Sequence, residues 1–132
     1  MNKILIVDDK PEARKLLAIA LKNPNHEIIE AASGLAALQI IKEQKPDVVL
    51  LDVIMPGSVN GFQACEWIKA DADTKNTFVI LISGLDEKKD FDEARKAGAN
   101  AYLVKPFRLS RLAEIVANHD KLADTFILEI VR

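Results

Sequence analysis

Three carboxylates and one lysine have the residue types and positions to do chemistry in this chain. Asp8 and Asp9 follow directly on one short apolar run. Asp52 follows a second run, and Lys105 follows a third. Such runs are typical of strands buried on both faces of a parallel sheet, and ligands of these sheets bind beyond the carboxyl ends of the strands. We therefore expect the four side chains to share one polar cleft at that edge.

Three acids in one cleft could hold a divalent cation. Mg²⁺ takes oxygen ligands in octahedral geometry, keeps several waters and is commonly bound by one or two carboxylates together with phosphate oxygens. Asp9 and Asp52 could ligate Mg²⁺ directly and Asp8 through water, with Mn²⁺ as the alternative ion. The cation, or the Lys105 ammonium, would relieve the repulsion by which close carboxylates raise one another's pKa.

Asp52 could also act as a nucleophile. A carboxylate that attacks a phosphoryl group forms an aspartyl phosphate, and phosphoryl transfer depends mainly on positioning and charge neutralisation. The metal would neutralise charge from one side and Lys105 from the other. Ser83 ends a further apolar run and offers a hydroxyl to a third phosphoryl oxygen, and Gly84 leaves room for its backbone amide to approach.

Five strand-like runs alternate with five helical patterns and must position these residues. The strands are expected at residues 3–7, 26–31, 47–51, 78–82 and 101–104, the second of them at an edge. The intervening segments carry apolar residues at helical spacing, with Pro11 in a first turn, Ser33 as a cap and Gly98 after a helix end. This alternation predicts one α/β domain with a mostly parallel sheet and helices on both faces.

The end of the chain fits two structures. Apolar residues keep a helical period from Leu112 to Ile130, yet residues 125–131 fit a strand equally well on propensity. We expect a domain over residues 1–119 and an extension over 120–132 that prolongs the last helix. A helical stripe through Phe126 and Ile130 would then suggest a homodimer as a hypothesis.

Composition limits the function classes. The 132-residue chain has a net charge of −2 and no basic stripe, which argues against direct binding of nucleic acid. Its one cysteine, Cys65, allows no intrachain disulfide, which suits a reducing compartment. No apolar stretch has the length of a membrane span, and no signal peptide precedes the first strand, so we expect a cytoplasmic protein without membrane contact.

Four short motifs together resemble the receiver domain of two-component response regulators. They are Asp8-Asp9, Asp52-Val53-Ile54-Met55-Pro56 with Gly61, Ser83-Gly84, and Lys105-Pro106-Phe107. Each motif alone is weak, but their joint order and their places at strand ends are specific. The resemblance covers residues 3–118 and implies a flavodoxin-like (βα)5 doubly wound sheet of strand order 2-1-3-4-5.

The resemblance also implies a phosphorelay function. Asp52 would accept a phosphoryl group from a phosphohistidine on a histidine kinase or histidine phosphotransfer protein. Mg²⁺ would bind Asp9, Asp52 and the backbone carbonyl of Ile54, with Asp8 assisting. A receiver of this kind is not an enzyme in the ordinary sense, because it catalyses only its own phosphorylation and dephosphorylation.

A switch is implied as well. Ser83 would be the switch hydroxyl, Lys105 the phosphate-binding lysine, and Tyr102 the aromatic side chain that changes rotamer when the hydroxyl moves. A cis peptide is expected before Pro106. The signal would pass to a downstream protein partner on the face made by the fourth helix, fifth strand and fifth helix.

Two departures from the family pattern are visible. The loop at residues 56–61 is one residue longer than the usual spacing, which affects the chain path after Asp52. Ile54 and Leu85, two residues past Asp52 and Ser83, are apolar at positions that tune water access to the acyl phosphate. We therefore hypothesise slow spontaneous dephosphorylation.

Other functions fit some of the same residues. Asp8 and Asp9 alone could cap the first helix, and Tyr102 alone could be a core residue. A binding module of this fold that works without phosphorylation would not need the intact acids and lysine. An aspartyl-phosphate phosphatase would need a second acid where Ile54 stands, and a cap domain.

Overall fold

Six parallel strands form a single sheet in the computed structural model, which describes residues 1–131. The strand order is β2-β1-β3-β4-β5-β6, so the expected order 2-1-3-4-5 is observed for the first five strands, with β2 at an edge. The strands are β1 (Asn2–Val7), β2 (His26–Ala31), β3 (Val48–Asp52), β4 (Phe78–Ser83), β5 (Ala101–Val104) and β6 (Ile127–Glu129).

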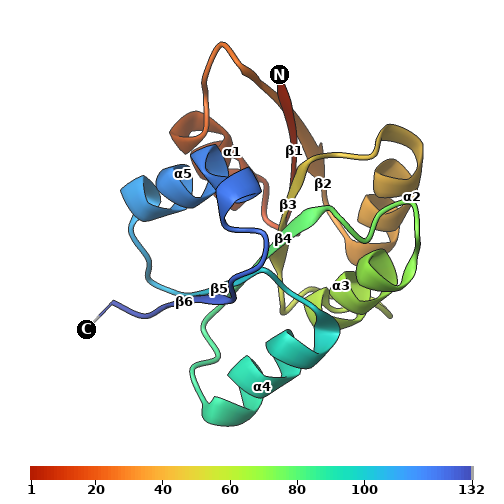
Figure 1. Ribbon diagram of the computed structural model, residues 1–132, viewed down its shortest axis with the longest axis vertical. Coiled ribbons are helices and arrows are strands. Elements are labelled where there is room, and N and C mark those ends of the chain that lie inside the picture. Colours follow the sequence, from red (N-terminus) through yellow and green to blue (C-terminus); the bar gives the residue numbers. More distant parts are fainter. Residues whose placement is uncertain (132) are drawn as a thin grey trace.

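Five helices cover the sheet in two layers (Figure 1). They are α1 (Pro11–Ala20), α2 (Gly34–Gln44), α3 (Gly61–Ala70), α4 (Lys88–Ala97) and α5 (Leu109–Ala117). Helices α1 and α5 lie together on one face, and α2, α3 and α4 lie side by side on the other. This is the doubly wound α/β fold that the alternation of elements predicts.

The two layers bury two apolar clusters, one on each side of the sheet. Successive residues of a strand face opposite sides of the sheet, so Leu5 and Val7 of β1 pack in the cluster between the sheet and helices α2, α3 and α4. Ile4 and Ile6 pack on the other side, against α1 and α5. Every residue of β3, β4 and β5 is buried, which fixes where these strands end and therefore where their terminal polar residues lie.

Local signals set the ends of the helices. Pro11 begins α1, where its missing N–H leaves no bond unmade, and Ser33 caps α2 by accepting a hydrogen bond from the N–H of Ala36. At α3, Asn60 and Gln63 form a reciprocal capping box. Helix α4 ends at Gly98, whose positive φ of 88° suits a residue without a Cβ.

The expected prolongation of the last helix from residue 120 onward is wrong for residues 120–131, and residue 132, which the same prediction covers, lies outside the described residues. Helix α5 ends at Ala117, a short 3₁₀ turn follows at His119–Lys121, and residues 127–129 form β6. This strand pairs with β5 in parallel, so it supplies partners to backbone groups that would otherwise line an open sheet edge. The helical stripe through Phe126 and Ile130 is therefore not formed.

None of the helices described over residues 1–131 has both the length and the apolar character needed to cross a bilayer.

Candidate functional site

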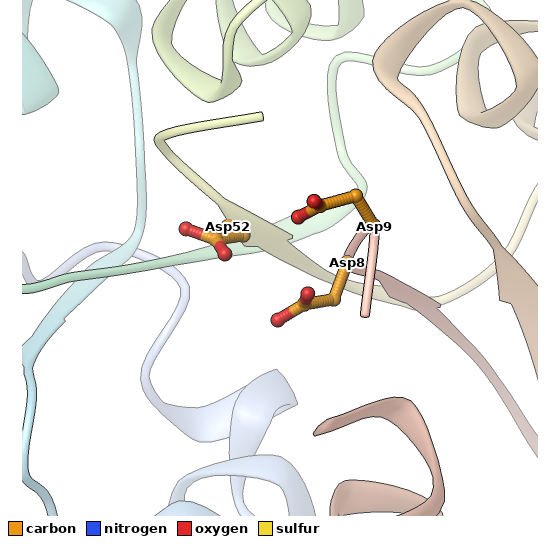
Figure 2. Close-up of side chains that lie close together, drawn as sticks. All are labelled: Asp8, Asp9 and Asp52. Carbon is orange, nitrogen blue, oxygen red and sulfur yellow. The ribbon is translucent and has the colours of Figure 1, made fainter. Parts of the chain in front are cut away.

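Asp8, Asp9 and Asp52 meet at the carboxyl edge of the sheet, as expected. Asp8 and Asp9 follow β1, and Asp52 is the last residue of β3, which lies beside β1. One carboxylate oxygen from each residue lies within 4.8 Å of those of the other two. Figure 2 shows the side chains next to one another, with the carboxylates of Asp8 and Asp9 directed to the side on which Asp52 lies.

Burial makes this cluster costly. Asp8 is 4% and Asp52 5% exposed, so both carboxylates have lost most of their contact with water. Asp8 Oδ1 accepts a hydrogen bond from the Lys10 N–H at 2.9 Å, and Asp52 Oδ1 accepts one from the Ile54 N–H at 3.2 Å. These two bonds orient the carboxylates without neutralising them.

Asp9 carries the one buried side-chain oxygen without a hydrogen-bond partner among the described residues. This atom is Oδ1, and the Lys10 ammonium lies 3.6 Å from it, which is beyond hydrogen-bond length. An unpartnered buried oxygen beside two further carboxylates is the donor set that a hard cation such as Mg²⁺ prefers. The residues therefore fit the metal that the sequence predicts.

Lys105 approaches the cluster from the end of β5. Its Nζ lies 3.5 Å from Asp52 Oδ2, and its side chain remains 42% exposed. Burial raises the pKa of Asp52, and the nearby Asp8 carboxylate adds to this, whereas Lys105 and the Ile54 N–H act in the opposite direction. A cation bound among the acids would oppose this rise in the pKa of Asp52.

Ser83 ends β4, the strand next to β3, and its side chain is buried. Its hydroxyl oxygen accepts a hydrogen bond from the Leu85 N–H at 3.1 Å, and its backbone carbonyl accepts one from the Lys105 N–H at 2.8 Å. Ser83 is thus tied to the residue that approaches Asp52. The peptide bond between Lys105 and Pro106 is cis, as expected.

Gly84 is not required by the packing of the chain itself. A Cβ built on it meets no heavy atom within 4 Å. The space around Gly84 is therefore open, as the expected approach of a group to its backbone amide would need.

Tyr102 lies in the core rather than at the surface. Its ring packs edge-on against Phe91 and stacks at longer range with Phe62. Its hydroxyl donates to the carbonyl of Leu85 at 2.8 Å, and burial raises the pKa of this hydroxyl. Ser83 and Tyr102 therefore bind the two backbone groups of the same residue, Leu85.

Gly61 sets the path of the chain after Asp52. A Cβ on Gly61 would lie 2.7 Å from the Asp52 carbonyl oxygen and 2.7 Å from Val53 Cα. Glycine thus lets the start of α3 pack against the backbone of the expected phosphorylation site. Between Asp52 and Gly61, Val59 is buried, whereas Ile54 is 60% exposed.

Sequence reasoning missed Arg14, which comes from α1. Its guanidinium donates to the carbonyl of Asp8 at 2.7 Å and to Glu30 of β2 at 3.0 Å. It therefore fixes the backbone of the acidic pair. The position of Arg14 in the helix after β1 was the only sequence signal for this role. An arginine on the solvent-exposed side of a helix can occur in the same sequence pattern, so the signal is not specific.

A cavity of about 550 Å³ opens beside the cluster, between α1 and α5. Asp8, Asp52 and Lys105 line it at one end, and apolar side chains that include Leu16 and Phe107 line the rest. The acidic cluster is accordingly reached from the side of α1 and α5.

Two curated relatives are similar to this chain in sequence over most of its length. Protein PilH of Pseudomonas aeruginosa is 39% identical over 106 residues, which cover 80% of this chain and 87% of that relative. The polar-differentiation response regulator DivK of Brucella ovis is 30% identical over 118 residues, which cover 89% of this chain and 95% of the relative.

Solved structures show the same fold. The chemotaxis protein CheY4 of Vibrio cholerae superposes with a TM-score of 0.81 at 28% identity, covering 89% of this chain and 98% of that one. The signal receiver domain of a DNA-binding response regulator from Colwellia psychrerythraea gives a TM-score of 0.84 at 29% identity, covering 92% and 99%. The family model of the response regulator receiver domain matches residues 4–117, and the chain therefore belongs to this family.

Proposed function

We propose that this receiver domain is a phosphorylation switch that accepts a phosphoryl group on Asp52. The observation that carries the proposal is the meeting of three carboxylates and one ammonium around a single buried acid. One carboxylate oxygen each of Asp8 and Asp9 lies within 4.8 Å of one of Asp52, and Lys105 Nζ lies 3.5 Å from Asp52 Oδ2. With a divalent cation held by the acids and the Lys105 ammonium beside them, this set would neutralise the charge of a phosphoryl group on Asp52, which is what phosphoryl transfer requires.

The donor would be a phosphohistidine on a histidine kinase or histidine phosphotransfer protein. An Asp52 carboxylate oxygen attacks phosphorus, the bond from phosphorus to the imidazole nitrogen breaks, and the nitrogen keeps the electron pair and takes up a proton. The product is an aspartyl phosphate on Asp52. The cavity beside α1 and α5 leads to this carboxylate and gives the donor its approach.

Asp8, Asp9 and Asp52 would hold Mg²⁺, or Mn²⁺, together with the backbone carbonyl of Ile54. When bound, the cation neutralises phosphoryl charge. The chain's own contribution is to hold these oxygens in place: Arg14 binds the Asp8 carbonyl, and the N–H groups of Lys10 and Ile54 orient the carboxylates of Asp8 and Asp52.

Ser83 and Lys105 would bind the remaining phosphoryl oxygens. To do so, the Ser83 hydroxyl has to leave the Leu85 N–H, to which it is bonded at 3.1 Å. The Tyr102 hydroxyl holds the carbonyl of the same residue, so the movement of Ser83 would disturb the bond of Tyr102 as well. We expect this coupling to pass the signal to a protein partner on the face of α4, β5 and α5.

Labelling by acetyl phosphate tests the proposal. The wild-type chain should gain an acid-labile phosphoryl group that depends on Mg²⁺, and Asp52→Asn should gain none. Asp92→Asn, which removes an acid from the exposed face of α4, is the matched control and should label normally. Persistent label in Asp52→Asn, or an unlabelled wild type, would favour a binding module that works without phosphorylation.

A further inference from the structure

The terminal segment, residues 125–131, crosses the face formed by α4, β5 and α5. Its strand β6 pairs with β5 in the register Ala101↔Ile127, Tyr102↔Leu128 and Leu103↔Glu129. In Figure 1 it lies alongside β5 at the end of the sheet opposite β2. The segment lies outside residues 4–117, which the family model matches, so it is an addition to the receiver domain of this chain.

Phe126 attaches the segment to α4. The guanidinium carbon of Arg95, in the last turn of α4, lies 4.6 Å from the centroid of the Phe126 ring. A cation at this distance over an aromatic face is attracted by the ring. This contact selects an aromatic side chain at the start of the segment.

Glu129 attaches the segment to α5. Arg111 Nε donates to Glu129 Oε1 at 2.6 Å, and the same guanidinium also pairs with Glu114 on its own helix. The contact with Glu114 therefore positions the Arg111 guanidinium on α5, where it can bind a carboxylate of a strand paired with β5. This contact selects an acidic side chain three residues after the aromatic one.

Ile127 and the backbone fill the space between these two contacts. Ile127 is buried, and its N–H donates to the carbonyl of Asn100 at 3.0 Å, directly before β5 begins. Leu128, whose side chain points away from the contacts of Ile127, is exposed. The edge of β5 thus binds an extended strand whose four residues, at positions 126–129, are aromatic, apolar, unrestricted and acidic in that order.

The terminal segment leaves cavities against the rest of the chain on both of its sides. A cavity of about 270 Å³ lies between it and α5, lined by residues that include Arg108 and Arg111. A second cavity, of about 340 Å³, lies beside Arg95 and Phe126. Only three residues of the segment pair with β5, and the ion pair to Arg111 is partly exposed. Contacts of this kind contribute little each, so another strand could replace the segment.

We propose that α4, β5 and α5 form a docking surface for a partner protein's extended strand of this pattern, and that residues 126–129 are the internal occupant with which the partner strand competes. The surface does not include the acidic cluster. The proposal rests on the partner face named under the proposed function and adds the kind of strand that this face recognises and the internal segment that occupies it. Peptide binding is measured without a phosphodonor, so its failure is distinguishable from a failure of phosphoryl transfer to Asp52.

Binding of a labelled peptide to the full chain tests the competition. The probe is a fluorescein-labelled peptide with the sequence of residues 124–132, followed by fluorescence anisotropy. The receiving protein is the full chain with Phe126→Ala and Ile127→Asp, which weaken the internal strand but leave Arg95, Arg111 and β5 unchanged. We expect this variant to bind the peptide at least tenfold more tightly than the wild-type chain does.

Three controls decide the result. A peptide with Glu129→Gln should bind several-fold more weakly, as should the original peptide on the protein variant that also carries Arg111→Gln. Lys42→Gln, at an exposed position of α2, should leave peptide binding unchanged. Hydrogen exchange at the amides of residues 127–129 should be faster in the double variant than in the wild type, because a carboxylate replaces the buried Ile127 side chain.

The proposal is overturned if the Phe126→Ala, Ile127→Asp double variant does not bind the peptide, or binds it no better than the wild type does. It is also overturned if exchange at residues 127–129 is unchanged, since the named contacts would then not hold the strand. A concentration-dependent dimer of the variant in sedimentation would assign the surface to a second copy of the chain rather than to a separate partner.

Discussion

The carboxyl edge of β1 and β3 and the outer edge of β5 place charge in opposite ways. At the first edge, three carboxylates of the same sign are gathered within 4.8 Å, and two of them are buried. At the second edge, opposite charges on Arg111 and Glu129 pair near the surface across a short stretch of strand. The first arrangement costs stability and suits a site that binds cations and phosphoryl groups, whereas the second stabilises a contact weakly.

A side chain at Gly61 should disturb the packing of α3 against the backbone of Asp52 and Val53, at the carboxyl edge of β3. Gly61→Ala places a Cβ 2.7 Å from the backbone of Asp52 and Val53, so we expect it to lower the free energy of unfolding by about 1–3 kcal/mol. The matched control, Gly84→Ala, meets open space and should change stability by less than about 0.5 kcal/mol. Urea unfolding of both variants measures the difference, and equal stabilities would refute the assigned contact.

Removing one acid from the cluster should weaken cation binding. Because Asp9 Oδ1 has no other hydrogen-bond partner, we expect Asp9→Asn to raise the dissociation constant for Mg²⁺ at least tenfold, about 1.4 kcal/mol. Isothermal titration calorimetry measures this, with Asp92→Asn as the control. An unchanged Mg²⁺ affinity in Asp9→Asn would remove that residue from the proposed ligands.

Water access at the same edge should respond to Ile54. Its side chain is apolar and 60% exposed, so it can shield a phosphoryl group on Asp52 from attacking water. We expect Ile54→Asn to shorten the lifetime of the phosphorylated chain several-fold, measured as loss of label after the donor is removed. A lifetime equal to or longer than that of the wild type would contradict the hypothesis of slow dephosphorylation.

The electrostatic cost of the cluster should appear in stability. The pKa of Asp52 is raised by burial, so between the ordinary aspartate pKa and the raised value the folded state holds more protons than the unfolded state. The free energy of unfolding of the wild type should therefore fall as pH rises through this window. Without Mg²⁺, Asp52→Asn should be more stable at neutral pH by on the order of 1 kcal/mol.

This gain should disappear as the pH falls below the ordinary pKa of aspartate, where the Asp52 carboxyl is protonated in both the folded and the unfolded state. Thermal or urea unfolding at several pH values measures it. A variant that is less stable than the wild type at neutral pH would show that the paired Lys105 outweighs the burial of Asp52.

The outer edge should show the smallest effect. Arg111→Gln removes the partly exposed pair with Glu129, and we expect a loss of at most about 1 kcal/mol in global stability. Hydrogen exchange at residues 127–129 should nevertheless become faster, whereas exchange in β3 should not change. A large global destabilisation would show that the terminal segment belongs to the core.

These two regions also differ in what the sequence can predict. The strands that lead to Asp8, Asp52 and Lys105 are uniform apolar runs, and because neighbouring parallel strands end together, the meeting of these residues follows from the sequence. The terminal segment is different. Its apolar residues fit a helix and a strand alike, and pairing with β5 decides between them, which is a tertiary contact.

Residues that act through the backbone were also missed. Arg14 binds a carbonyl of the acidic pair, and Asn100 binds the N–H groups of Val79 and Ile127 through its side-chain and backbone oxygens. Such contacts depend on which backbone groups are left unpaired after folding, and no spacing in the sequence indicates them.

The most direct test is to map the phosphoryl group on the wild-type chain after incubation with acetyl phosphate, with and without Mg²⁺. The account predicts a single modification, on residue 52, that forms only when the divalent ion is present. A phosphoryl group found elsewhere in the chain, or one that forms equally well in the presence of a chelator, would contradict it.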